Sequence, residues 1–458
     1  MRILVCVKVV NGELNPFDAC ALEEALRIGG EVSVLSMCPP SVSDVLRPLT
    51  RLGVKNVYLL SDSCYAGSDT LATSYILSLA ARKIGFDLIL CGRQTVDGDT
   101  AQVGPCLATK LGIGLVTNVL KLTVDSDTVS CETRLGNESV KLPALLTVER
   151  INTLRFPSIF SRLGEVTLWS NSDVGAEPSK CGLHGSPTKV LKVFEAPAGQ
   201  RECRFISPLE LKSIVEESLK MDSASAEIKE SDIKLPFVLA VGETVAEKAR
   251  LIADRVKVIE CGDPRQIAEE IRRENADVVL WNADLWGRRN APIVAALLET
   301  GLCADCTHLE TDGKKLFMFR PAKSGSVIAK IECSTSPQMA TVRCDKVTSE
   351  LMISGGRGVA EHMDEFDTLA EALGGTKAAS RALVDAGLAP YSHQIGLTGR
   401  NASAKVYVAV GISGAVQHTC ALDAVGTVIA INPDKDARIF SYSDYGVVAS
   451  IEDVIKEI

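Results

Sequence analysis

Short apolar runs alternate with amphipathic stretches over the first 110 residues of the chain. The runs are rich in Val, Ile and Leu, as buried strands are, and the stretches between them have helical periodicity. Strands are expected at residues 3–7, 31–37, 56–60 and 87–91, and helices at 15–28, 43–52, 68–84 and 99–111. Strands joined through helices form a parallel, doubly wound α/β sheet with right-handed crossovers.

This pattern occurs a second time. The segment that begins DLILCG at Asp87 matches the segment that begins DVVLWN at Asp277, and KLPALLTVER (141–150) matches STSPQMATVRC (334–344). The repeat predicts two related α/β domains, as a fusion of two homologous subunits would give. The second copy starts with a strand at 237–242 and is shorter at its start than the first.

A third α/β region follows, and its strongest element is VYVAVGISGAVQHTCALDAVGTVIAIN (406–432). A buried strand, a small-residue turn, a helix opened by Gln417 and His418, and a second strand at 427–431 are expected. The turn would lie at the carboxyl edge of the sheet, where backbone N–H groups can face an anionic ligand. The predicted domains are 1–155, an arm with one helix (208–221) at 156–236, a second α/β domain at 237–345, and 346–458.

Composition excludes several classes of function. Lys and Arg total 49 against 58 for Asp and Glu, a net charge of −9, which argues against a nucleic-acid surface. No apolar run reaches the ~20 residues of a membrane helix, and the N-terminus lacks a signal-peptide pattern, so no membrane insertion is expected. Fifteen Cys, mostly in apolar runs, indicate reduced thiols in a cytoplasmic protein. Cys303 and Cys306 form one C-x-x-C with only His308 nearby, and we interpret them as ordinary small residues, with no metal site.

Two loops carry candidate chemistry. The polar loop at 92–105 offers Thr100, Gln102 and backbone amides to a phosphate or a ribose, although a helix capped by Asp99 with no ligand is equally compatible. It is neither a G-x-G-x-x-G fingerprint nor a P-loop. In the third domain, SGGRGV contains Arg357, and Arg381 follows in ASR. Taken singly, these arginines would more often make surface ion pairs, and His418 would more often cap a helix or pack in the core.

Taken together, the motifs of the third domain resemble a known family. SGGRGV, ASR-x-x-VDAG, Q-x-G-x-TG, VAVGISGAVQH, AIN and FSYSDYG resemble the FAD-binding domain of electron transfer flavoprotein alpha subunits. PQMATVR and TGLCADCT are similar to the preceding domain of that subunit, and LVCVKVV, NPFDACALEEALR and GRQTVDGDTAQVGP to the beta subunit. The resemblance implies a beta-like and an alpha-like subunit in one chain, paired within it, with the first βα segment of the alpha-like part missing.

The resemblance implies an FAD site in the third domain. Arg381 would lie over the flavin and His418 would approach its pyrimidine edge, where a cation or a helix N-terminus stabilises the negative charge of the reduced ring. The other implied FAD-binding residues are Arg357, Ser380, Gln394, Ile395, Gly396, Leu397, Thr398, Ser413, Gly414, Ala415, Val416, Gln417, Asn432, Ser450 and Ile451. The family usually has Gln in place of Leu397 and Asp in place of Ser450, and these departures put one flavin contact and one adenosine contact in doubt.

The resemblance also implies a nucleotide site in the first domain, which holds AMP in simple carriers and a second FAD in electron-bifurcating members that oxidise NADH. The matching residues are Cys6, Asn15, Pro16, Phe17, Asp18, Met37, Asp97, Gly98, Asp99, Thr100, Ala101, Gln102, Val103, Gly104 and Ala108. DGDTAQVGP is closer to the bifurcating version. LRFPSIFSRL (154–163) resembles the loop that docks on flavin dehydrogenases such as the acyl-CoA dehydrogenases.

Two other classes of function remain as alternatives. An NAD-dependent dehydrogenase would need a G-x-G-x-x-G after an early strand and a substrate acid or base, and neither is evident in the sequence. An adenine-nucleotide sensor would explain the first domain, although it would not explain the motifs of the third. The partner dehydrogenase and the flavin potentials are not encoded in any motif.

Overall fold

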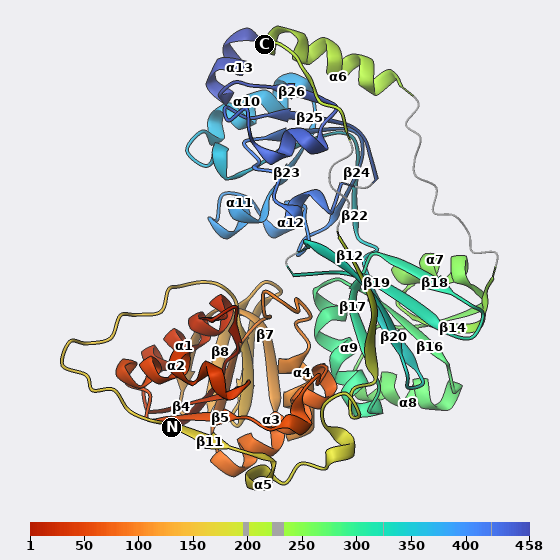
Figure 1. Cartoon of the computed structure of the whole chain (residues 1–458). Helices are drawn as coiled ribbons and strands as arrows, with labels where there is room; N and C mark the ends of the chain where they lie inside the picture. The colour runs from red at the N-terminus through yellow and green to blue at the C-terminus, as the bar shows by residue number, and fades with distance from the viewer. Residues whose placement is uncertain (196–200, 222–232, 324, 423) are drawn as a thin grey trace. The chain divides into compact units, whose positions relative to one another are not determined.

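The computed structural model describes residues 1–195, 201–221, 233–323, 325–422 and 424–458 (Figure 1). Parts of the predicted arm, 196–200 and 222–232, therefore lie outside the described residues. The chain forms two compact units. Unit 1 comprises Met1–Val193, Ser231–Lys323 and Ala329–Val342, and unit 2 comprises Phe194–Glu230, Ser324–Ile328 and Arg343–Ile458. The four-part division of the sequence remains a prediction.

The first copy in unit 1 is a sheet in the order β11-β5-β4-β1-β6-β10-β7-β8-β9. Its strands are β1 (Arg2–Cys6), β4 (Glu31–Met37), β5 (Asn56–Leu60), β6 (Leu88–Gly92), β7 (Gly114–Asp125), β8 (Thr128–Thr133), β9 (Gly136–Lys141), β10 (Ala144–Val148) and β11 (Val166–Trp169). Its main helices are α1 (Pro16–Ile28), α2 (Ser43–Leu46), α3 (Thr70–Ile84) and α4 (Val103–Leu111). The strands from β11 to β7 are parallel, and apolar clusters cover both faces, as expected for a doubly wound sheet.

The second copy in unit 1 is a parallel sheet in the order β15-β14-β16-β21-β17. Its strands are β14 (Leu235–Val241), β15 (Ala253–Ile259), β16 (Val278–Asn282), β17 (Leu302–Cys306) and β21 (Gln338–Val342), and its helices are α7 (Glu243–Ile252), α8 (Pro264–Glu274) and α9 (Leu285–Leu298). Three strands between β17 and β21 in the sequence form a separate sheet together with β12 (Thr188–Glu195). They are β18 (His308–Thr311), β19 (Leu316–Ala322) and β20 (Val327–Cys333).

The strand orders correct one expectation about the second copy. β14 lies between β15 and β16 as β1 lies between β4 and β6, so the first βα segment is present and its predicted loss is wrong. The second copy ends at β15, the counterpart of β4, and lacks counterparts of β5 and of β11, which pairs outside β5. Strands can be omitted from the edge of a sheet without opening the core, whereas the central strand β14 is hydrogen-bonded on both sides.

The repeat extends to one unusual backbone position. Asn118 in β7 and Asp305 in β17 both have positive φ, at 58° and 56°. The N–H of Asn118 donates to Thr147 Oγ1 at 3.1 Å, and the N–H of Asp305 donates to Thr341 Oγ1 at 2.8 Å. Both lie where the pairing register shifts, so the two copies share the same bulge.

Unit 2 contains a six-stranded parallel sheet in the order β13-β26-β25-β24-β22-β23. Its elements are β13 (Arg204–Phe205), α6 (Leu211–Lys220), β22 (Lys346–Gly355), α10 (Met363–Leu373), β23 (Thr376–Ala379), α11 (Arg381–Asp385), β24 (Asn401–Val410), α12 (Val416–Thr419), β25 (Ala424–Ile431), β26 (Tyr445–Val447) and α13 (Ile451–Glu457). Side chains of β24 alternate between two buried clusters, one of which includes α6. The predicted buried strand at 406–410 is therefore confirmed as the centre of this sheet.

Candidate functional site

Backbone hydrogen bonds align the carboxyl ends of the strands in unit 2. The N–H of Gly356 donates to Val410 O at 2.8 Å, and the N–H of Ser380 donates to Gly355 O at 2.8 Å. The N–H of Gly411 donates to Ile431 O at 2.9 Å. Segments that are distant in sequence therefore meet at one edge of a parallel sheet, where α/β proteins bind their ligands.

The glycines of the SGGRGV and VGISG turns serve this alignment. A Cβ on Gly356 would collide with the carbonyl of Gly411, and a Cβ on Gly411 would meet the backbone of Gly358. Gly411 also has a φ of +62°. Glycine is required at these positions because the two turns pack against each other.

The loop that follows α11 is fastened to two neighbours. The N–H of Ile395 donates to Ala379 O at 2.9 Å, and the N–H of Leu397 donates to Gln417 O at 2.6 Å, which joins the loop to α12. Gln394 Nε2 donates to Thr398 Oγ1 at 2.8 Å. The predicted Q-x-G-x-TG segment thus lies between β23 and the helix that carries His418.

His418 is buried and paired. Its Nε2 lies 2.7 Å from the hydroxyl of Tyr407, and the residue is 6% exposed. Burial lowers the pKa of His418 to about 4, with the carbonyl of Ile395 opposing the shift. The imidazole is therefore neutral at pH 7.

Buried polar atoms at this edge of the sheet fit a polar cofactor. Ser380 Oγ, Gln394 Oε1 and His418 Nδ1 are buried and make no hydrogen bond among the described residues. Such atoms carry a desolvation cost unless a ligand or water satisfies them. The three come from the segments implied to hold FAD, so the residues present fit that cofactor.

The other predicted residues of unit 2 differ in exposure. Arg357, Ser413, Ala415 and Gln417 are exposed, Arg381, Thr398, Val416 and Ser450 are partly exposed, and Ile395, Gly396, Leu397, Gly414, Asn432 and Ile451 are buried. Arg381 Nε forms an ion pair with Asp385 Oδ2 at 3.0 Å.

Three of these predicted residues already have structural roles. Asn432 uses both ends of its amide, donating to Ile412 O at 3.0 Å and accepting from the N–H of Asp434 at 3.0 Å. Ser450 caps α13, and Ile451 packs in the core. Their places in the FAD site stay predictions.

The predicted N-terminal site also lies at the carboxyl edge of a sheet, beyond β1, β4 and β6. Asn15 Nδ2 donates to Gln94 O at 2.9 Å, and Asp18 accepts from the N–H groups of Lys8 and Gly92 at 2.8 and 2.9 Å. Burial raises the pKa of Asp18 to about 7 against these hydrogen bonds. The segment at 15–18 is therefore fixed against the loop at 92–97.

The loop from Asp97 to Gln102 differs from its prediction. The helix begins at Val103 with Gln102 at its N-cap position, so Asp99 does not cap it. Asp99 and Ala101 have φ of 52° and 56°, outside the helical region, and the loop therefore continues to Gln102. Lys8 Nζ pairs with Asp97 Oδ2 at 2.6 Å. Cys6, Phe17, Asp99, Gly104 and Ala108 are buried, and Pro16, Met37, Asp97, Gly98, Thr100, Ala101 and Val103 are partly exposed.

Gln102 joins the two copies of unit 1. Its Oε1 accepts from Thr70 Oγ1 at 2.7 Å, and its Nε2 donates to Leu302 O at 3.1 Å. The N–H of Lys323 donates to Asp97 O at 3.1 Å. The side chain of Gln102 is thus committed to the contact between the copies, and its role toward a nucleotide stays a prediction.

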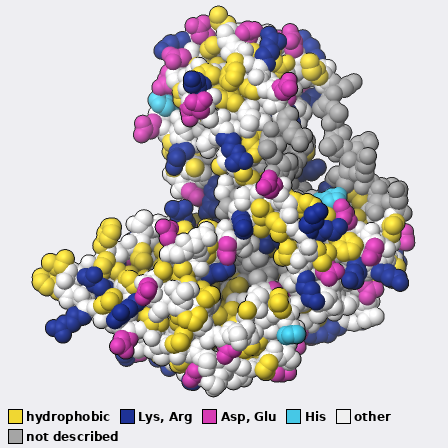
Figure 2. All heavy atoms as spheres, in the orientation of Figure 1, with side chains coloured by type: hydrophobic (Ala, Val, Ile, Leu, Met, Phe, Trp, Pro, Cys, Tyr) yellow, Lys and Arg dark blue, Asp and Glu magenta, His cyan; other side chains and the backbone are white. Residues whose placement is uncertain are grey.

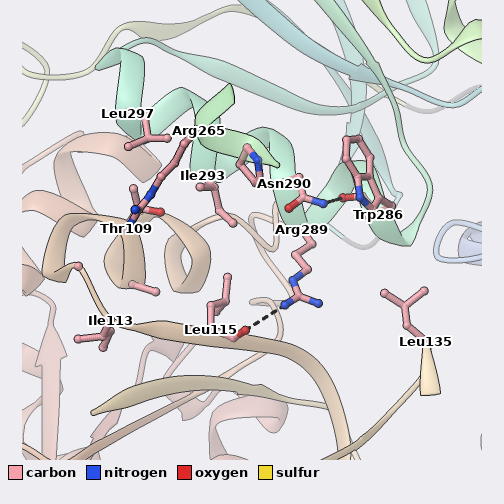
Figure 3. Close-up of a pocket in the computed structure, with 13 residues that line it drawn as sticks. Thr109, Ile113, Leu115, Leu135, Arg265, Trp286, Arg289, Asn290, Ile293 and Leu297 are labelled. Atoms are coloured by element: carbon pink, nitrogen blue, oxygen red, sulfur yellow. Dashed lines mark hydrogen bonds between the residues drawn. The ribbon is translucent and has the colours of Figure 1, made fainter. Parts of the chain in front are cut away.

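The same contact encloses a cavity of about 410 Å³ between α4 and α9 (Figure 3). Arg289 points across it, forming an ion pair with Glu138 at 2.7 Å and donating to Leu115 O at 3.1 Å. Asn290 Nδ2 donates to Trp286 O at 3.0 Å. The polar side chains at the centre of this cavity therefore hold the two copies of the α/β domain together.

Sequence reasoning missed two residues of the unit 2 site. Tyr407 was part of an apolar strand, and its only signal was a phenol among Val and Ala. Arg343 ended the PQMATVR motif, and its guanidinium reaches the FAD loop, with Nη2 donating to Gly396 O at 2.7 Å. An Arg directly after a run of buried residues is the signal that could have found it.

The sequence had predicted neither a metal site at the Cys303 and Cys306 pair nor a membrane helix. Cys306 Sγ donates to Cys303 O at 3.8 Å, and His308 is exposed beside Glu310. In the described residues no cluster of His, Cys, Asp or Glu could hold a metal. None of the described helices is both long enough and apolar enough to cross a membrane.

Comparison with known proteins identifies the family. Residues 3–170 and 237–361 match the electron transfer flavoprotein domain, and 347–423 match the electron transfer flavoprotein FAD-binding domain. Protein FixA of Bradyrhizobium diazoefficiens is 43% identical over 219 residues, covering 43% of this chain and 76% of FixA. The electron transfer flavoprotein subunit beta of Thermoanaerobacterium thermosaccharolyticum is 43% identical over 192 residues, 39% of this chain and 74% of that subunit.

A third relative is subunit CarD of the caffeyl-CoA reductase-Etf complex of Acetobacterium woodii. It is 38% identical over 233 residues, which cover 43% of this chain and 89% of CarD. The two matched domains together span most of the chain, with the beta-like part first and an FAD-binding domain last. The chain therefore belongs to the electron transfer flavoprotein family, as a fusion of a beta-like and an alpha-like subunit.

Proposed function

We propose that this chain accepts electrons from a flavin dehydrogenase or from NADH and passes them on singly through the FAD of unit 2. One observation carries the proposal. Three buried polar atoms, from Ser380, Gln394 and His418, have no hydrogen-bond partner among the described residues and lie at the carboxyl edge of the sheet, in a region matched to an FAD-binding domain. Bound FAD would supply the redox chemistry, since it can exchange one or two electrons.

The chain's own residues bind and tune that cofactor. Ser380 and the loop from Gln394 to Thr398 would hold it, and His418 would present a neutral ring to it. Arg381 would add positive charge that is partly balanced by Asp385, 3.0 Å away. A cation near a ring that gains negative charge on reduction raises its potential.

A second adenine nucleotide would bind at the N-terminal site, and FAD is favoured over AMP there. Support comes from the partly exposed residues Asp97, Gly98 and Thr100 and from the CarD relative, whose name places it in a reductase-Etf complex. With FAD at this site the protein would take a hydride from NADH and divide its two electrons between acceptors. With AMP it would be a simple relay.

An exposed loop would dock the partner. Phe156, Ile159 and Phe160 are 95%, 85% and 87% exposed. The loop projects from unit 1, and hydrophobic side chains gather there (Figures 1 and 2). Arg155 anchors its base through hydrogen bonds to Glu23, including one from Nη2 at 2.9 Å and one from the backbone N–H at 3.0 Å. A partner of the acyl-CoA dehydrogenase class would cover this apolar surface.

Cofactor analysis tests the proposal. Two FAD per chain, one of which is bleached by NADH, would support the bifurcating form, and one FAD with one AMP would support the relay. A colourless protein that binds only an adenine nucleotide would support a sensor. NADH oxidation without a second protein acceptor would support an NAD-dependent dehydrogenase. The fifteen free thiols suit the cytoplasm.

A Phe156→Ser/Phe160→Ser variant tests the docking loop. Both side chains are exposed, so fold and cofactor content should not change. The variant should bind the partner dehydrogenase with lower affinity, which an electron-transfer assay between the two proteins would measure. Leu168→Ser, at 57% exposure elsewhere on unit 1, is a matched control.

A further inference from the structure

Tyr407 and His418 form a buried pair whose hydrogen can be placed. The hydroxyl of Tyr407 lies 2.7 Å from His418 Nε2, and Tyr407 is 0% exposed. Tyr407 is on the central strand β24, and His418 is on α12, which has only four residues. In the described part of unit 2, Tyr407 is the only side chain that hydrogen-bonds to the His418 ring.

Each group has one hydrogen to give. Burial raises the pKa of Tyr407, so the phenol keeps its proton, and burial keeps the His418 ring neutral. A neutral imidazole has one N–H and one bare nitrogen. The hydrogen between the two rings therefore comes either from the phenol or from Nε2.

The two possible donors differ in how many buried polar groups they leave without a hydrogen-bond partner. If Nε2 donated, the phenol hydrogen would have only the Ser354 hydroxyl to turn to, and a bare Nδ1 would be buried without a donor, because Nδ1 makes no hydrogen bond to a described residue. If the phenol donates to Nε2, only the Nδ1–H remains. The backbone carbonyl of Ile395 favours a protonated ring nitrogen, and therefore favours this second arrangement. Each unpaired buried group costs free energy, so the second arrangement is the stable one.

We propose that Tyr407 is a positioning residue that donates to His418 Nε2, fixes the Nδ1–H tautomer and leaves Nδ1–H as a neutral donor for FAD. The inference rests on the proposed function for its cofactor. A fixed donor stabilises charge on the reduced ring without being charged itself. The backbone holds the ring in place, since Leu397 N–H donates to Gln417 O at 2.6 Å and His418 N–H donates to Ala415 O at 2.8 Å.

The tautomer can be measured without cofactor. The chain has five histidines, so ¹⁵N-histidine labelling and two-bond ¹H–¹⁵N correlation spectra of the apoprotein can resolve each ring, with His418→Gln assigning the pair of signals. We expect Nδ1–H in the wild type and a mixture of tautomers in Tyr407→Phe. Tyr65→Phe, which removes another buried phenol that bonds to Asn171 at 3.1 Å, should leave the His418 signals unchanged. An Nε2–H tautomer in the wild type would overturn the inference.

A mutant cycle tests the consequence for FAD. Tyr407→Phe should weaken FAD binding about tenfold and lower the flavin potential, since one hydrogen bond of ordinary strength is lost. In a His418→Gln background, Tyr407→Phe should change neither quantity. An equal shift in both backgrounds would mean that Tyr407 acts through packing alone. A wild type that takes up no FAD would refute the proposed function and the cofactor half of this inference, while the apoprotein spectra still decide the tautomer.

Discussion

Arg343 donates from Nη2 to the carbonyl of Gly396 at 2.7 Å, although the two residues are 53 positions apart. Arg343 is the residue after the last of β21 and is 6% exposed, and its Nη1 makes no hydrogen bond in the described part of the chain. Gly396 belongs to the loop predicted to hold FAD. A buried guanidinium at the start of the last segment of unit 2 therefore fixes that loop.

Arg343→Met should destabilise unit 2 by about 2 kcal/mol, because the Gly396 carbonyl loses a charge-assisted donor. FAD affinity should fall with it, since the loop is no longer held. All three tryptophans, Trp169, Trp281 and Trp286, lie in unit 1, so their fluorescence would not report the change. Hydrogen exchange of unit 2 peptides and FAD titration are the appropriate measurements.

Arg250→Met is the control for loss of an arginine. Arg250 pairs with Glu243 at 2.8 Å, but the two side chains are 54% and 70% exposed. Such surface pairs contribute about 0.5 kcal/mol or less. An Arg343→Met protein with wild-type exchange and FAD affinity would show that the loop keeps its shape without the guanidinium.

Unit 2 should lose stability in mild acid because of His418. The pKa of His418 is about 4 in the folded chain, below its ordinary value of 6.5, so the unfolded state binds a proton first as pH falls. This contribution is absent above pH 6.5 and grows to about 3 kcal/mol of destabilisation by pH 4, where it levels off. Stability therefore rises with pH between 4 and 6.5.

Urea unfolding of unit 2, read by pulsed hydrogen exchange at each pH, measures this effect. His418→Gln should flatten the dependence between pH 4 and 6.5, although it shifts the baseline. The other groups of unit 2 titrate equally in both proteins, so the difference between them isolates His418. Identical slopes would mean that the ring is protonated in the folded state.

Much of the fold could be predicted because it depends on local patterns. The strands at 31–37 and 56–60 were placed at their observed bounds, and the central strand of unit 2 followed from one apolar run. Helix starts were less certain. The helix expected from 99 begins at 103, since the positive φ of Asp99 and Ala101 leaves no trace in residue type.

The site was predicted by motif and only partly by chemistry. Segments such as Gln394–Thr398 were recognised, but the partners that hold them were not. Arg343 and Gly396, or Tyr407 and His418, meet only after the sheet has formed, and no sequence period connects them. The omission of a β5 counterpart was also invisible, because α7 and α8 keep the same alternation of strand and helix.

Arg381 and Asp385 should shift the flavin potential in opposite directions. Arg381→Ala removes positive charge that the family resemblance puts over the ring, so the potential should fall while FAD stays bound. Asp385→Asn removes the carboxylate 3.0 Å from Arg381 Nε, so the potential should rise. The loss of a cation near the ring is worth about 1 to 4 kcal/mol at effective dielectric constants of about 80 to 20, and the effect of Asp385→Asn should be smaller because the carboxylate acts through Arg381. Spectroelectrochemistry of both variants checks the signs, and a shift of the same sign in both would remove Arg381 from the site.

The last prediction concerns Gly98 and the identity of the second nucleotide. A Cβ built on Gly98 would meet only Thr95 Oγ1, at 3.4 Å, and Gly98 is not among the residues with positive φ. The fold therefore does not require glycine there, unlike Gly92, whose Cβ would collide with Phe17 and Asp18. The resemblance to the family implies a bulkier acidic residue in this place in the AMP-binding version. We infer that the small residue is kept for a ligand.

Gly98→Asp should leave the protein folded and convert the site from FAD to AMP. The carboxylate would repel a pyrophosphate and fill the space it needs, which should weaken FAD binding about tenfold while AMP is retained. Gly262→Asp, at an exposed glycine with no atom within 4 Å of its Cβ, is the matched control. Chromatography of the nucleotides released on denaturation gives the counts. If both variants release the wild-type nucleotides in equal amounts, Gly98 does not select the ligand.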